Sequence, residues 1–114
     1  MRVDELSHGE HRQLDIAIAL ATEPRLLLLD EPMAGLGPEE SARMVEILHE
    51  LKGTVAILLI EHHMEAIFTL ADRLTVMLDG RIIAGGRPEV LRTDVAVRQA
   101  YLGEKYGAER SGHR

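Results

Sequence analysis

Two short apolar runs, each followed at once by polar side chains, most constrain how this chain can fold. Leu26–Leu29 precedes Asp30-Glu31, and Thr54–Ile60 precedes Glu61-His62. Continuous apolar runs of this length are typical of strands that are buried on both faces. The helical pattern between them predicts a parallel βαβ unit, in which ligand chemistry collects at the carboxyl ends of the strands. Both groups of polar side chains are therefore candidate catalytic or ligand-binding residues.

The rest of the chain shows helical and strand patterns in alternation. Ser7 and Glu10 form a capping-box pattern that predicts the start of a helix, and Pro24 favours its end near Thr22. Further expected elements are helices over Pro38–Lys52 and Met64–Ala71, strands Leu74–Leu78 and Arg81–Ala84 joined by an Asp79-Gly80 turn, and helices Pro88–Leu91 and Val95–Tyr101. The predicted fold is α/β, a mostly parallel sheet with flanking helices and a C-terminal hairpin.

Composition narrows the class of protein. The chain has 114 residues, a formal net charge of −6 and no cysteine. The acidic balance, without a basic stripe, argues against nucleic acid as a partner, and thiolate metal sites are excluded. No apolar stretch is long enough to cross a bilayer, so we expect a cytoplasmic protein. We expect one partial domain over residues 1–103 and a polar tail over residues 104–114.

The pair Asp30-Glu31 is the strongest candidate for catalysis. One carboxylate can orient a hydrated magnesium ion, and the next can accept a proton from an attacking water molecule. The alternative is a strand that ends in a solvated acidic turn. His62, at the end of the second run, could donate a hydrogen bond to a terminal phosphate, or could simply lie on the surface beside His63.

The segment Ser7-His8-Gly9-Glu10 is a candidate phosphate site, because the first turn of a helix presents unpaired N–H groups and Gly9 permits close approach. The alternative is a capping box with no ligand. A metal site that includes His8 and His11 is disfavoured, because their spacing matches no zinc pattern.

Taken together, these motifs resemble the ATP-binding-cassette (ABC) ATPase family. The matching pieces, in family order and spacing, are Leu6–Glu10, Leu26–Glu31, Ala34–Gly37 and His62. The resemblance covers nearly the whole chain, as the C-terminal half of such a subunit. It is greatest to the ATPase subunits of importers for branched-chain amino acids and of their urea-importer relatives, through Ser7–Glu10, Ala34–Pro38 and Ala100–Gly103.

The resemblance implies a role for each matching residue. Asp30 would hold Mg²⁺ through water, Glu31 would be the general base, and His62 would contact the γ-phosphate of ATP. The remaining positions implied in nucleotide binding or in coupling between the two ATP sites are Ser7, His8, Gly9, Glu10, Gly35, Leu36 and Gly37. The implied partners are a second ATPase subunit, identical or different, and transmembrane permease subunits on the cytoplasmic face of the membrane.

Several positions depart from the family pattern. His8 stands where the family usually has glycine, Glu10 where it has glutamine, and Gly37 where many relatives have aspartate. Glu10 would place an acid near a phosphate, unless the capping box turns its side chain back to its own backbone.

No G-x-x-x-x-G-K-[ST] phosphate-binding loop occurs in the sequence. Two hypotheses about function follow. In the first, the chain is the catalytic and signature portion of an ABC importer ATPase. In the second, the isolated chain is an inactive fragment or an interaction module. A DNA-repair or chromosome-maintenance ATPase is a third, disfavoured class, because there is no sustained heptad pattern.

Overall fold

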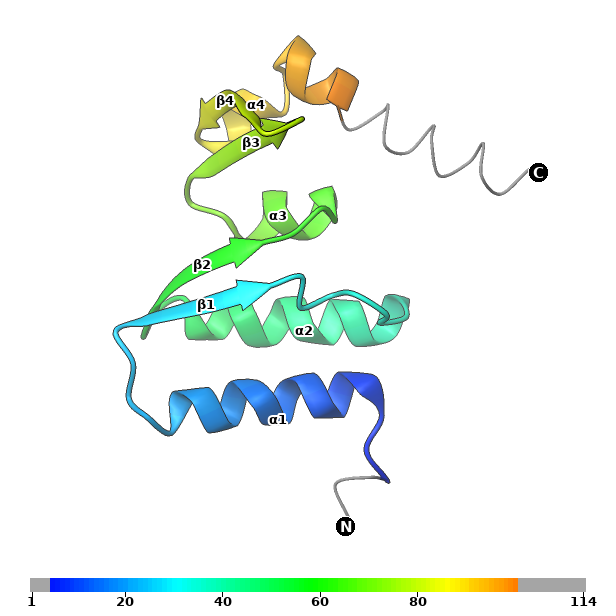
Figure 1. The fold of residues 1–114 in the computed structure, drawn as a ribbon, viewed down its shortest axis with the longest axis vertical. Coiled ribbons are helices and arrows are strands. Elements are labelled where there is room, and N and C mark those ends of the chain that lie inside the picture. Colours follow the sequence, from blue (N-terminus) through cyan, green and yellow to red (C-terminus); the bar gives the residue numbers. More distant parts are fainter. Residues whose placement is uncertain (1–4, 101–114) are drawn as a thin grey trace, which may run out of the picture. The chain divides into compact units, whose positions relative to one another are not determined.

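The computed structural model describes residues 5–100, and the chain divides between Ala66 and Ile67 into two compact units. Helices and strands alternate along most of the chain (Figure 1). The elements are α1 (His8–Leu20), β1 (Leu26–Asp30), α2 (Pro38–Leu51), β2 (Ala56–Ile60), α3 (Met64–Leu70), β3 (Leu74–Leu78), β4 (Arg81–Gly86) and α4 (Pro88–Leu91), and residues 95–100 are also helical. Tyr101 and the predicted tail over residues 104–114 lie outside the described residues.

The N-terminus of α1 is a complete capping box, as predicted. The Ser7 hydroxyl accepts the Glu10 backbone N–H, and the Glu10 carboxylate accepts the Ser7 backbone N–H, each at 3.2 Å. These bonds satisfy two of the donors that a helix start leaves unpaired. The helix ends at Leu20, before Pro24, close to the predicted end.

In the N-terminal unit, β1 and β2 form a two-stranded parallel sheet. Leu28 is paired with Leu58, and Asp30 with Ile60, so the two strands end side by side. Leu27 of β1 is buried, as are Met44 and Leu48, which lie one turn apart on α2. This βαβ unit agrees with the prediction, and it places the residues after β1 next to the residues after β2.

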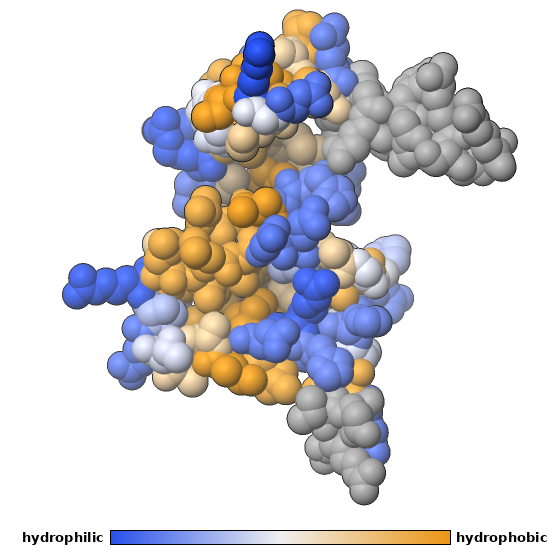
Figure 2. All heavy atoms as spheres, in the orientation of Figure 1, coloured by the Kyte–Doolittle hydropathy of each residue, from blue (hydrophilic) through white to orange (hydrophobic). Residues whose placement is uncertain are grey.

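The prediction that both strands are buried on both faces is wrong for this chain. Leu28 is 65% exposed and Leu58 is 55% exposed. Two further side chains on the same face, those of Leu26 and Ile60, are also exposed. Figure 2 shows apolar side chains gathered over β1 and β2. Alternate side chains of a strand point to opposite faces, and within residues 5–100 only the face that carries Leu27 is covered.

In the C-terminal unit, β3 and β4 form an antiparallel hairpin. The turn residues Asp79 and Gly80 have φ of 50° and 77°, which matches the predicted two-residue hairpin turn. Among the described residues β3 pairs with β4, as the predicted C-terminal hairpin requires. The short turn brings β4 back beside β3 at little entropic cost, so local pairing is favoured.

Leu91 of α4 and Val97 form part of the core of the C-terminal unit, with exposures of 3% and 1%. The guanidinium of Arg92 stacks 4.9 Å from the centre of the Phe68 ring, a favourable cation–π distance. Within residues 5–100, no helix combines the length and the apolar character needed to cross a bilayer.

Candidate functional site

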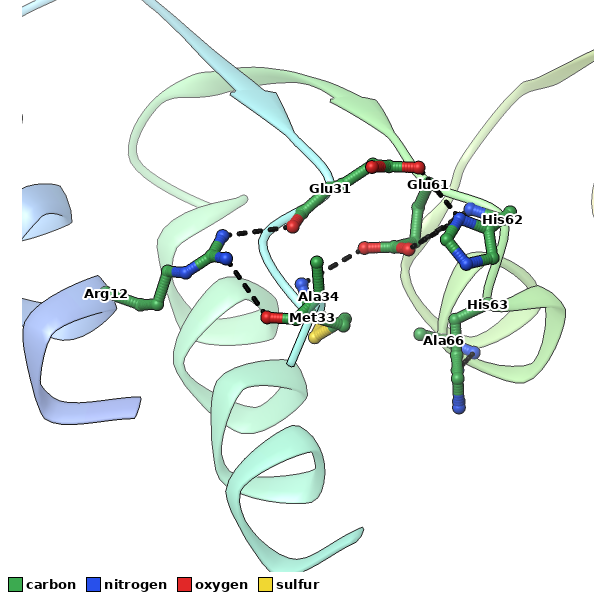
Figure 3. A network of polar contacts seen from close by, with 8 residues as sticks. All are labelled: Arg12, Glu31, Met33, Ala34, Glu61, His62, His63 and Ala66. Atoms are coloured by element: carbon green, nitrogen blue, oxygen red, sulfur yellow. Dashed lines mark hydrogen bonds and ion pairs between the residues drawn. The ribbon is translucent and has the colours of Figure 1, made fainter. Parts of the chain in front are cut away.

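The carboxyl ends of β1 and β2 bring Glu31 and His62 into direct contact, although 31 positions separate them in the sequence. His62 Nδ1 lies 2.8 Å from Glu31 Oε1 (Figure 3). The Glu31 side chain is 48% exposed and that of His62 is 60% exposed. Exposed pairs contribute little to stability, so this contact mainly fixes geometry at a solvent-accessible edge of the sheet.

The contact also constrains how the two side chains share protons. An ionised carboxylate only accepts hydrogen bonds, so His62 Nδ1 donates to Glu31 when that carboxylate is charged. The other ring nitrogen, Nε2, then remains for a second partner. The pair can therefore contact a ligand through His62 and a water molecule through Glu31.

The backbone at Glu31 is unusual. Its φ is 49°, in the left-handed region that costs free energy for any residue with a Cβ atom. Pro32 follows it, and the Glu31 carbonyl accepts the Ala34 N–H at 3.1 Å, which closes a turn. The Glu31 N–H still donates to Ile60 O at 2.7 Å, so the sheet ladder ends at this residue. Strained backbone of this kind is concentrated at functional sites.

Asp30 is the last residue of β1, and strand alternation places it on the same exposed face as Leu28. Among residues 5–100, no group of three or more acidic or histidine side chains is arranged to hold a metal ion. The single exposed carboxylate of Asp30 is nevertheless compatible with Mg²⁺, because this ion keeps several water ligands and takes its other oxygen ligands from the phosphates of a substrate.

The residues of the signature segment serve the start of α1. The capping box engages Ser7 and turns the Glu10 carboxylate back to its own backbone, as the sequence suggested. His8 is exposed. Gly9 is buried, and a Cβ atom there would lie 2.7 Å from a carboxylate oxygen of Glu40 on α2. A side chain at this position would therefore displace the flexible Glu40 carboxylate.

The predicted loop residues Gly35, Leu36 and Gly37 connect the Glu31 turn to α2. Gly35 has φ of 78°, which favours glycine, and the Leu36 N–H donates to Met33 O at 3.1 Å. Gly37 is the N-cap residue of α2 and precedes Pro38. Because Gly35 and Gly37 are exposed, this loop is accessible to another molecule.

Two residues of the site were not assigned a role from sequence. The side chain of Arg12 on α1 donates to Glu31 O and to Ala34 O, each at 3.0 Å. The carboxylate of Glu61, whose side chain is 1% exposed, accepts the backbone N–H groups of Met33 and His62, each at 3.1 Å. A signal existed for Glu61, an acid beside the candidate histidine, whereas nothing in the sequence distinguished Arg12.

Comparison with known proteins defines the class. A family model described as "ABC transporter" matches residues 1–34. A solved structure, the ADP conformation of MJ1267, an ATP-binding cassette of an ABC transporter, superposes with a TM-score of 0.75 at 35% identity, over 87% of this chain and 41% of that chain. The α/β fold of this chain is therefore that of part of an ATP-binding cassette, and the predicted fold class is confirmed.

Within that class, this chain is similar to ATP-binding proteins of amino acid transport. It is 41% identical to the high-affinity branched-chain amino acid transport ATP-binding protein LivG of Escherichia coli K12, over 90% of this chain and 41% of LivG. It is also 41% identical to BraF of Pseudomonas aeruginosa, another such protein, over 87% of this chain and 40% of BraF. The predicted resemblance is confirmed, and the chain spans less than half the length of these relatives.

Proposed function

We propose that this chain is the signature-bearing and catalytic part of an ATP-hydrolysing subunit of an ABC importer for branched-chain amino acids. The observation that carries the proposal is the contact between Glu31 and His62 at the ends of adjacent parallel strands. The similarity to LivG and BraF supports the class of transported solute.

In this proposal Glu31 is the general base of ATP hydrolysis. Its Oε1 contacts His62, so Oε2 can accept a proton as a water molecule attacks the γ-phosphate. His62, when cationic, donates through Nδ1 to Glu31 and through Nε2 to a γ-phosphate oxygen. The two side chains thus align the water with the phosphorus and stabilise the charge that develops on the phosphoryl group.

The other predicted residues complete the site around the nucleotide. Asp30 would hold Mg²⁺ through water, and the ion would neutralise charge on the phosphate oxygens. The first turn of α1, from Ser7 to Glu10, would offer its positive end to the γ-phosphate of ATP held mainly by a second, facing ATPase subunit. The exposed loop Gly35–Gly37 would contact that subunit and couple the two sites.

The proposed assembly includes transmembrane permease subunits, which would hold the chain at the cytoplasmic face of the membrane. The domain that performs this function is expected to include residues 1–103.

A chimera tests the catalytic role of Glu31. In E. coli LivG, this chain replaces the 105-residue stretch that it matches, and ATP binding and turnover are measured. Loss of a general base is expected to lower turnover of the Glu31→Gln variant by ~10²–10⁴-fold while ATP binding is retained. Glu50→Gln, an exposed acid of α2, is the matched control and should leave turnover unchanged. Unchanged turnover in Glu31→Gln would rule out the assigned role.

Uptake measurements test the importer assignment separately. Cells of E. coli that lack LivG receive the chimera, and the uptake of labelled leucine is followed. We expect the chimera to restore uptake and its Glu31→Gln variant to fail. A chimera that hydrolyses ATP at the normal rate but restores no uptake would contradict the importer assignment and leave the ATPase assignment standing.

A second candidate function is that of an interaction module without ATPase activity. The exposed apolar face of the β1–β2 sheet favours it, because contiguous apolar surface usually marks a contact with another polypeptide. Calorimetric titration of the purified chain with Mg-ATP distinguishes the two functions. Micromolar binding accompanied by hydrolysis would refute the interaction module.

A further inference from the structure

The turn that carries the proposed base is in a conformation that needs support. Glu31 has φ of 49° and precedes a proline, so the backbone at this position is strained. The carboxylate is half-exposed, and its contact with His62 is a single one. The direction of the Glu31 side chain therefore depends on how firmly the surrounding backbone is held.

Arg12 supports this turn from α1. Its two terminal nitrogens donate to the carbonyl oxygens of Glu31 and Ala34, the first and last residues of the turn (Figure 3). A guanidinium presents several donors in a rigid, planar fork, which suits two acceptors at once. Lysine at this position could offer only a point charge. The contact spans 19 positions to Glu31 and 22 to Ala34, so it ties one helix to a distant turn.

Glu61 supports the same turn from β2. Its buried carboxylate accepts the Met33 N–H on one oxygen and the His62 N–H on the other. Because both partners are donors, a carboxylate is required: the amide of glutamine would place one of its own donors against a backbone N–H. Glu61 thus fastens the turn on one side and the backbone of His62 on the other.

We propose that Arg12 and Glu61 are positioning residues that hold Glu31 toward its water, Arg12 from α1 and Glu61 from the end of β2. This inference rests on the proposed ATPase function. The first turn of α1 is the segment proposed to contact the nucleotide of the facing subunit, and Arg12 lies on the same helix.

Kinetics of the chimera test the proposal. Arg12→Lys, Arg12→Gln and Glu61→Gln are compared with the matched controls Arg43→Lys, Arg43→Gln and Glu50→Gln, which change exposed residues of α2. A base displaced by a fraction of an ångström should lower kcat about 10-fold, while KM for ATP stays within about 2-fold, because neither residue reaches the nucleotide. Arg12→Lys retains the charge and the aliphatic stem, so it guards against a variant that fails to fold.

Nuclear magnetic resonance of the full chain gives a second readout that does not depend on activity. A positive φ brings the amide and Hα protons of a residue close together, so Glu31 should show a strong cross-peak between them. We expect this cross-peak to weaken in Arg12→Lys and to persist in Arg43→Lys.

The two measurements separate failure of this inference from failure of the proposed function. If the wild-type chimera hydrolyses no ATP, the proposed function fails, and the Glu31 cross-peak still reports whether Arg12 holds the turn. If Glu31→Gln abolishes turnover but the Arg12 and Glu61 variants keep their kcat and the cross-peak, the ATPase function stands and the positioning role is overturned.

Discussion

Two glutamates occupy equivalent positions, each directly after one of two paired parallel strands, and both lie near the His62 ring, yet they differ in exposure and in their hydrogen-bond partners. Glu31 follows β1, is 48% exposed and contacts His62 through its side chain. Glu61 follows β2, is 1% exposed and accepts two backbone N–H groups, and its Oε1 also lies 3.8 Å from His62 Nδ1. An exposed carboxylate with a spare oxygen can exchange protons with a ligand, whereas one surrounded by backbone donors is a structural group.

The comparison explains why the residue type alone does not assign a role. The turn at Glu31 carries the chain toward α2, so the carboxylate stays at the open edge of the sheet. The backbone after Glu61 instead continues to α3, and the side chain turns back under the Glu31 turn to reach Met33. The two acids therefore act on the same turn, one from its exposed side and one from beneath.

The largest expected effect on stability belongs to Glu61. Glu61→Gln replaces one acceptor by a donor and leaves a buried backbone N–H without its partner, which should cost about 1–3 kcal/mol of unfolding free energy. Urea unfolding of the chimera measures this change, with Glu50→Gln on the surface of α2 as the control, expected within about 0.5 kcal/mol. A loss no larger than the control's would remove the distinction between the two glutamates.

A smaller effect of opposite sign is expected at Glu31. Glu31→Gly should raise the unfolding free energy by up to about 1.5 kcal/mol, because a left-handed penalty of about 1–2 kcal/mol is relieved at an entropic cost of about 0.5–1 kcal/mol. Turnover is expected to be lost at the same time, a trade of stability for function. Glu31→Ala keeps the Cβ atom and should show no gain in stability, so equal behaviour of Gly and Ala would argue against strain.

The smallest effect on stability is expected from His62. Its contact with Glu31 joins two half-exposed side chains, and such pairs typically contribute about 0.2–1 kcal/mol before screening by salt. His62→Gln should therefore change the unfolding free energy by no more than about 1 kcal/mol while lowering turnover. Thermal melts and ATPase assays of the same sample check both parts, and a large destabilisation would show that the pair is structural.

The sequence predicted the elements of the fold well, because their signals are local. The Ser7–Glu10 capping box, the proline at the start of α2 and the Asp79-Gly80 turn each act over a few residues. The pairing of β3 with β4 was predictable for the same reason, because the Asp79-Gly80 turn joins the two strands directly. The apolar strands were expected to be buried on both faces, but a run of leucines does not specify which elements cover it.

Parts of the candidate site could also be predicted. Glu31 and His62 follow apolar strands, and parallel strands bring their carboxyl ends together, so the sequence indicated both residues. Arg12 could not be found in this way, because its contacts depend on the direction in which α1 crosses the Glu31 turn. The burial of Glu61 was equally hidden, since its position in the sequence matches that of the exposed Glu31.

The most direct test compares Glu31→Gln and Glu61→Gln in the same chimera, with turnover and unfolding free energy measured on each sample. Glu31→Gln is expected to lose ~10²–10⁴-fold in turnover with its unfolding free energy unchanged to within about 0.5 kcal/mol. Glu61→Gln is expected to lose about 1–3 kcal/mol of unfolding free energy and only about 10-fold in turnover. The reverse pattern, with Glu31→Gln destabilised and active and Glu61→Gln stable and inactive, would contradict the assignment of Glu31 as the base.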